Sequence, residues 1–313
     1  CIPECSQNQI ALELINRLDS SFNVRKKENA LDELHMIGTP ALETLFYALK
    51  HKNRNIRKEI PRVLVWIRDP SIINPLLNAL HDNDFQVALA VEEALENLEE
   101  KVIEPLIPLL ENSDASIKIR VIHILGEIAT RLFDDSRNQD DLILEARNKL
   151  SPTLPPLAAL LESQNPAVKL NTLWTLRLIK DPRPVDAILP LLEDKNFDVR
   201  IQAIRTLGEL GEYSAVDRLI ETLSDENWQI RMESATSLGR IKSKQAVLPL
   251  IKCLGDSDWR VRHRAIISLQ ILKDKRSIDP LVNLFKNDNN LIVKRGIIYS
   301  LAEIADDAHT VEF

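Results

Sequence analysis

A row of charged and aromatic side chains, spaced by close to 31 residues, contains the residues best suited to a binding function. Trp174 and Tyr299 supply aromatic rings, and Arg62 and Arg205 supply guanidinium groups. These residue types are enriched among the hot spots of protein interfaces, so the row favours recognition of a protein ligand. The expected surface consists of Arg62, Trp66, Glu93, His123, Trp174, Arg205, Thr236, Arg264, Ile267 and Tyr299.

Sequence patterns typical of catalysis or metal binding do not occur. None of the 6 histidines precedes a glutamate, so there are no His-Glu pairs that could converge on iron. Cys1 and Cys5 have no second pair of thiolates or imidazoles nearby for zinc. No Gly-x-Ser-x-Gly motif marks a nucleophile. We therefore expect no catalytic residue, no metal and no cofactor, and the sequence favours a binding protein over an enzyme.

The elements that position the row repeat along the chain. Val168, Val199, Ile230 and Val261 are 31 residues apart, and Val293 follows one residue late. We call these residues the register positions. Each is followed by a lysine or arginine, and an asparagine or aspartate lies three residues before it. A period of this length indicates a solenoid, in which each repeat contacts mainly its neighbours.

One repeat, residues 187–211, has the pattern of two antiparallel helices. A short apolar run at its start is followed by apolar residues at helical spacing from Val199 to Leu210. Asn196 stands where the second helix begins, and its side chain can cap an unpaired first-turn amide. Equivalent caps are expected at Asn53, Asp84, Asp114, Asn165, Asn227, Asp258 and Asn290. The predicted fold is therefore all-α, a right-handed α-solenoid of about nine helix pairs with the row on its concave side.

The repeat runs through the middle of the chain without a Gly/Ser/Pro linker, which predicts a single domain over residues 1–313. Within it we expect an N-terminal cap repeat at 7–38, repeats at 39–129 and 153–305, and a tail at 306–313. The chain begins at Cys1 rather than Met, so we expect a processed start or a piece of a longer protein.

Residues 130–152 interrupt the repeat. The spacing between Ile117 and Val168 is 51 rather than 31, which predicts an insertion after a helix that ends near Ala129. Insertions in solenoids project from the stack and often contact partners, although a solvated extra helix is an equally open alternative. Its acidic residues lack the spacing of a calcium loop and are Asp134, Asp135, Asp140 and Asp141.

A column of cations follows the register positions: Arg57, Lys118, Lys169, Arg200, Arg231, Arg262 and Lys294. Asp194, Asp225 and Asp256 recur at the same interval, which favours an intramolecular ladder of ion pairs over a surface for an anionic partner.

Two further features of the repeat are interpreted as structural. Gly208 and Gly239 allow either close helix approach or a kink. The aromatic residues two positions before the register are expected to pack on the adjacent repeat, and they are Phe85, Phe197, Trp228 and Trp259.

Composition restricts the partner class. The formal charge of -7 makes nucleic acid an unlikely partner, because nonspecific affinity for it depends on lysine and arginine. No apolar run reaches the roughly 18 residues of a membrane span. Three cysteines cannot form a disulfide framework, which favours a reducing, cytoplasmic location.

The segment PLIKCLGDSDWRVRHRAIISLQIL, residues 249–272, resembles a HEAT-like repeat of the kind found in phycobilisome lyases. The resemblance extends from about residue 40 to 305. It implies an armadillo-like α-solenoid, and for function it implies above all a protein-binding scaffold.

The same resemblance leaves two alternatives open. One is an E/F-type phycobilin lyase or bilin-binding chaperone acting on a phycobiliprotein. The bilin would then lie against His123, Trp174, Arg205 and Tyr299. The other is the sensor arm of a larger signalling protein.

Overall fold

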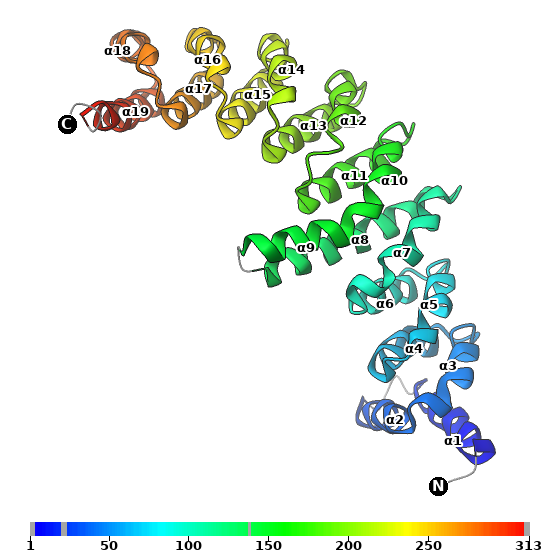
Figure 1. The fold of residues 1–313 in the computed structure, drawn as a ribbon. Helices are drawn as coiled ribbons and strands as arrows, with labels where there is room; N and C mark the ends of the chain where they lie inside the picture. Colours follow the sequence, from blue (N-terminus) through cyan, green and yellow to red (C-terminus); the bar gives the residue numbers. More distant parts are fainter. Residues whose placement is uncertain (1–3, 20–23, 137–138, 310–313) are drawn as a thin grey trace. The chain divides into compact units, whose positions relative to one another are not determined.

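The computed structural model describes residues 4–19, 24–136 and 139–309. Within these ranges the chain forms α-helices and short 3-10 helices joined by turns, with no strand (Figure 1). The predicted all-α class is therefore confirmed. None of the helices in the described ranges combines the length and the apolar character needed to cross a bilayer.

The helices form two compact units, residues 1–156 and 157–313. In each unit a short first helix and a longer second helix alternate, and consecutive second helices pack side by side, as expected for an α-solenoid. A single domain over 1–313 stays a prediction. The helices of the first unit are α1 (Glu4–Arg17), α2 (Val24–Ile37), α3 (Leu42–Ala48), α4 (Arg54–Ile67), α5 (Ile73–Ala79), α6 (Phe85–Glu96), α7 (Ile103–Leu106), α8 (Ala115–Asp135) and α9 (Asp140–Leu150).

The second unit contains the regular part of the repeat. α10 (Leu154–Leu160) crosses the division between the units in sequence. The remaining helices are α11 (Pro166–Ile179), α12 (Val185–Ile188), α13 (Phe197–Leu210), α14 (Val216–Glu221), α15 (Trp228–Ile241), α16 (Val247–Cys253), α17 (Trp259–Leu272), α18 (Ile278–Asn287) and α19 (Leu291–His309).

Side-chain caps begin the second helices as predicted. The Asn196 side chain accepts a hydrogen bond from the backbone N–H of Val199 at 3.1 Å, and Asn290 accepts one from Ile292 at 2.9 Å. The other six predicted caps also accept a first-turn backbone N–H. Each cap satisfies an amide that the helix cannot pair internally, so the local sequence sets where each second helix starts.

Glycines and hydroxyls hold neighbouring second helices close together. The Ser268 hydroxyl of α17 donates to the Ala235 carbonyl of α15 at 2.7 Å, and Ser237 donates to Ile204 of α13 at 2.9 Å. A Cβ atom added at Gly239 would lie 2.7 Å from the Ser268 Cβ. These glycines therefore serve close approach of the helices, and the kink alternative is not needed.

The insertion differs from its prediction at its start. Helix α8 does not end near Ala129 but continues to Asp135. The extra turns are held by Arg131, whose guanidinium donates to the Glu96 carbonyl of α6 at 2.9 Å. The insertion is therefore a continuation of α8 followed by α9. Its Ala146 and Leu150 are buried.

The aromatic residues before the register positions do not all pack as predicted. The ring of Trp228 on α15 is covered by the Arg260 guanidinium of α17, 3.3 Å from the ring centroid. Phe85 is 66% exposed, so the prediction is wrong for this residue. Arg54 and Gln86 beside it form polar contacts instead of supplying an apolar cover.

Candidate protein-binding surface

In the second unit the predicted row lies on the solvent side of consecutive second helices. Trp174, Arg205, Thr236 and Ile267 are half-buried, and Tyr299 is 63% exposed. The row thus runs over α11, α13, α15, α17 and α19, one residue per helix. We call these five residues, Trp174, Arg205, Thr236, Ile267 and Tyr299, the second-helix surface.

The residues on either side of each row position are buried in the core. Leu173 and Thr175 flank Trp174, and Ile266 and Ser268 flank Ile267, with no more than 2% of any of the four exposed. These flanking residues therefore belong to the packed core between the helices. Because the flanking side chains are packed, the row projects from a rigid support. A rigid support reduces the conformational entropy that the row would lose on binding a partner.

The side chain of Arg205 is fixed by an ion pair. Its Nε lies 3.1 Å from the Glu233 Oε1 of the next second helix, and its Nη2 lies 3.2 Å from Oε2. Glu233 is 6% exposed, so the carboxylate side of the ion pair is largely shielded from solvent. Arg205 therefore presents its remaining donors in one orientation.

Tyr299 lines a pocket of about 500 Å³ between α17 and α19. Ile267 forms part of its apolar lining, and Arg295 and Glu303 are charged residues at the same pocket. Burial lowers the pKa of His263, a further lining residue, and the nearby Arg264 and Arg295 charges lower it too. The imidazole is thus biased toward its neutral form, which can both donate and accept a hydrogen bond.

In the first unit Arg62 and Trp66 form one cluster on α4. The Arg62 guanidinium lies 4.5 Å from the Trp66 ring centroid, and the His35 ring lies 5.6 Å from that ring. Trp66 also lines a pocket of about 720 Å³ with residues that follow α4 and α6. The two predicted residues are therefore brought together by the structure.

Of the predicted residues on α6 and α8, Glu93 is exposed and His123 lies among acidic side chains. His123 Nδ1 lies 3.8 Å from Glu96 Oε1, and its Nε2 lies 3.9 Å from Glu127 Oε1. Burial raises the pKa of Glu96, against the lowering effect of Arg131 and His123. Glu96 and Glu127 were missed from the sequence, although Glu96 lies one helical turn after Glu93. No group of acids, histidines and cysteines in the described residues is arranged to hold a metal.

The predicted ladder of ion pairs is present. In each pair, the cation that follows a register position binds an aspartate of the next repeat. That aspartate lies two residues before the residue that caps the second helix of the next repeat. The N–O distances are 2.6 Å for Arg57–Asp82, 2.5 Å for Lys169–Asp194, 2.7 Å for Arg231–Asp256 and 2.7 Å for Arg262–Asp288. Arg200 instead donates to the Asp194 carbonyl at 2.9 Å. These paired cations are not a free surface for an anion.

The ladder predicts a loss of stability in acid. Burial alone would raise the pKa of Asp82, but hydrogen bonds from Arg57 and from the Asp84 amide hold it below its ordinary 3.8. The pKa values of Asp194, Asp256 and Asp288 are lowered in the same way. In acid the unfolded chain binds more protons than the folded chain, so the free energy of unfolding decreases as the pH decreases.

The ladder aspartates contribute fully to stability above the pKa that they have in the unfolded chain. This contribution is lost as the pH falls through their lower pKa values in the folded chain. Urea unfolding at pH 7 and pH 3.5 should show a lower midpoint at pH 3.5. Glu96 has a raised pKa and therefore changes stability in the opposite direction, but it is a single group and the ladder contains four aspartates with lowered pKa values. An equal or higher midpoint at the lower pH would contradict the assignment.

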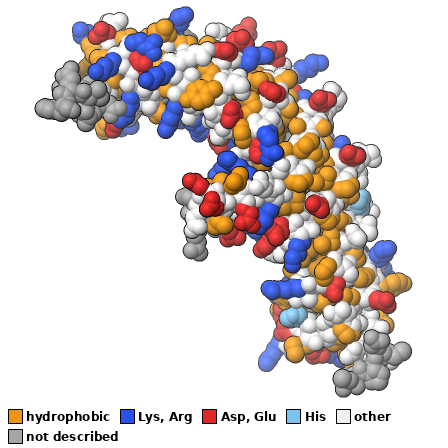
Figure 2. All heavy atoms as spheres, viewed as in Figure 1, with side chains coloured by type: hydrophobic (Ala, Val, Ile, Leu, Met, Phe, Trp, Pro, Cys, Tyr) orange, Lys and Arg blue, Asp and Glu red, His pale blue; other side chains and the backbone are white. Residues whose placement is uncertain are grey.

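All four acidic residues predicted for the insertion are exposed. Asp134 and Asp135 end α8, and Asp140 and Asp141 begin α9. Figure 2 shows acidic side chains gathered around these two helices. Leu144 on α9 is 57% exposed beside them, while Lys149 ties α9 to Glu100 at 2.5 Å.

The sequence matches the family model for HEAT repeats over residues 11–96, 154–227 and 216–302. The chain therefore belongs to the HEAT-repeat family, which confirms the resemblance. The internal gap between the matched ranges, residues 97–153, includes the insertion. No curated protein matches the sequence.

Solved structures are similar in fold at low sequence identity. The Escherichia coli protein YibA is 18% identical, with a TM-score of 0.50 over 90% of this chain and 99% of that chain. An engineered protein is 17% identical, with a TM-score of 0.42 over 95% and 99%. The CpcE–CpcF complex of phycocyanin lyase from Nostoc sp. PCC7120 is 23% identical, with a TM-score of 0.42 over 48% of this chain and 98% of that chain.

Proposed function

We propose that this protein is a recognition scaffold that binds a protein partner through its second-helix surface. One observation carries the proposal. Over five consecutive second helices a partly or fully exposed row residue stands on a packed support, and three of the five, Trp174, Arg205 and Tyr299, are of the types enriched in interface hot spots. Aromatic and guanidinium groups held in this way lose little conformational freedom on binding.

Two local features support the proposal and suggest where the contact is strongest. The pocket between α17 and α19 offers an apolar wall at Ile267 and an exposed aromatic ring at Tyr299. The insertion adds exposed Leu142 and Leu144 next to acidic residues, so it is a second candidate contact with the partner. Both combine apolar area with charge, as interface cores and rims do.

Replacing Tyr299 by alanine should weaken partner binding without lowering thermal stability. The exposed ring is a solvent-facing anchor, and loss of such an anchor costs on the order of 2 kcal/mol of binding free energy. Arg205 is a poorer choice, because its removal would leave the buried Glu233 carboxylate without its ion pair. Immobilised wild type and variant should be compared for the proteins they retain, with melting temperatures measured in parallel.

Tyr213→Ala is the matched control. Tyr213 is 66% exposed and lies in the connection between α13 and α14, outside the row. A protein retained by the wild type and by Tyr213→Ala, but lost with Tyr299→Ala, is the expected result. Equal retention by both variants would contradict a role for the second-helix surface.

A further inference from the structure

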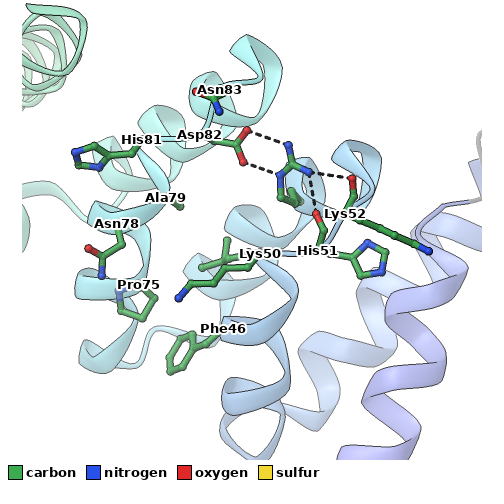
Figure 3. Close-up of a pocket in the computed structure, with 12 residues that line it drawn as sticks. Phe46, Lys50, His51, Lys52, Pro75, Asn78, Ala79, His81, Asp82 and Asn83 are labelled. Carbon is green, nitrogen blue, oxygen red and sulfur yellow. Dashed lines mark hydrogen bonds and ion pairs between the residues drawn. The ribbon is translucent and has the colours of Figure 1, made fainter. Parts of the chain in front are cut away.

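A separate pocket of about 520 Å³ lies between two neighbouring hairpins of the first unit, where α3 and α5 end (Figure 3). Its apolar lining includes Phe46 and Leu49 on one hairpin and Pro75 and Ala79 on the next. It lies at the ends of the first helices, so it is distinct from the second-helix surface. Its volume is sufficient for one apolar side chain and the polar group beside it.

The far wall of this pocket is rigid and already paired. Arg57 binds Asp82 through two hydrogen bonds of 2.6 and 3.0 Å, and it also donates to the carbonyls of His51 and Lys52. These contacts are drawn in Figure 3. Arg57 and Asp82 therefore neutralise each other and add no net charge to the pocket.

Lys50 is the cation left for a ligand. It is exposed, and its ammonium forms no ion pair with any described residue. In Figure 3 its side chain extends toward Pro75 and Phe46, whereas that of Lys52 points away from them. Asn78, with both a donor and an acceptor, lines the same side. The pocket thus places the Lys50 charge beside an apolar floor.

This charge is specific to one hairpin. Lys50 lies three residues before the cap Asn53, and the positions three residues before the other caps carry no lysine or arginine. They are His81, Glu111, Glu162, Glu193, Ser224, Gly255 and Asn287. The corresponding pocket between the last two hairpins has Gly255 at this position. The repeat itself therefore does not require a cation here.

We propose that this pocket binds a peptide segment in which an apolar side chain is followed by an aspartate or glutamate. The apolar side chain would lie against Phe46, Leu49 and Pro75, and the carboxylate would meet the Lys50 ammonium. The charge complementarity selects an acidic partner, although the protein as a whole has a net charge of -7. The proposal does not depend on the function assigned to the second-helix surface.

The test uses the full chain and the peptide Gly-Ser-Phe-Glu-Ser-Gly, labelled with a fluorophore on its N-terminal amine and amidated at its C-terminus, and binding is followed by fluorescence anisotropy. The wild type should bind it at submillimolar concentration. Changing the peptide Glu to Gln should weaken binding by about tenfold or more, because a hydrogen bond to a charged group is lost. Changing the peptide Phe to Ser should weaken it similarly by removing the apolar contact.

Lys50→Glu is the variant that tests the site. It should fold normally, because the repeat already carries Glu111, Glu162 and Glu193 at this position. It should bind the Phe-Glu peptide about tenfold or more weakly and should bind the Gln peptide better than the Glu peptide, because a glutamate at position 50 repels the peptide carboxylate; this reversed preference shows that the two groups interact. Lys58→Glu is the matched control, since Lys58 is exposed on the neighbouring α4 and does not line the pocket.

Two results would overturn the proposal. One is the absence of wild-type binding to the Phe-Glu peptide at millimolar concentration. The other is an equal loss of binding in Lys58→Glu and Lys50→Glu, which would indicate a general effect of net charge rather than a contact at Lys50.

Discussion

Replacing Gly239 by alanine should lower the free energy of unfolding by about 2 kcal/mol. The new Cβ would lie 2.5 Å from the Ser268 hydroxyl oxygen, 2.7 Å from its Cβ and 3.0 Å from its Cα. The Cα belongs to the backbone of α17, so rotation of the serine side chain cannot relieve the contact and α15 and α17 must separate. Overpacking of this kind costs about 1–3 kcal/mol or more, against about 1 kcal/mol gained from the helix propensity of alanine.

Urea unfolding of Gly239→Ala beside Gly255→Ala provides the comparison. At Gly255 the nearest atom to an added Cβ is 3.6 Å away, an ordinary contact, and no positive φ is involved. Gly255→Ala should therefore leave the midpoint nearly unchanged. If Gly239→Ala were as stable as Gly255→Ala, close packing between α15 and α17 would not be what stabilises this part of the stack.

Replacing Arg262 by methionine should cost about 3 kcal/mol of stability, since removing one partner of a buried ion pair leaves the other charge uncompensated. The Asp288 side chain is 3% exposed, and the Arg262 Nε lies 2.7 Å from its Oδ2. Arg262 also donates to the Asp256 carbonyl at 2.9 Å, so the turn that precedes α17 loses a donor as well.

The double variant Arg262→Met with Asp288→Asn should recover much of this loss. Asparagine keeps the turn, because Asn112 already occupies the same position before α8 and accepts from the Asp114 amide at 2.8 Å. Thermal or urea unfolding of the single and double variants measures the difference. A double variant no more stable than Arg262→Met would show that the buried charge is not the cause.

The parts of the fold that depend on local sequence were predictable. Asn196 begins a helix because a cap acts within one turn, and Trp174 faces solvent because the helical period fixes which neighbours are buried. The end of α8 was not predictable, because Arg131 extends it through a contact with Glu96 on another helix.

The candidate sites show the same division. The row over the second helices follows from periodicity alone, whereas the acidic environment of His123 depends on which side chains α6 and α8 bring together. The pocket at Lys50 was also missed, since it requires two hairpins to be placed side by side. A signal was present in the sequence, namely a lysine where the other repeats carry neutral or acidic residues or a histidine.

Each ladder aspartate performs two tasks with its two oxygens. In Asp288, Oδ1 accepts the Asn290 amide at 2.7 Å and Oδ2 binds Arg262 of the preceding hairpin. The turn that starts a helix and the docking of that helix on its neighbour therefore depend on the same carboxylate. Neighbouring repeats should then unfold together as larger cooperative units. At His51 the ring Nδ1 takes the Asn53 amide at 3.1 Å and offers no carboxylate to a cation of α2. The first hairpin is instead joined to α4 by the ion pairs Lys27–Glu59 at 2.6 Å and Arg62–Glu28 at 3.7 Å, so its docking does not share a carboxylate with the turn that starts α4.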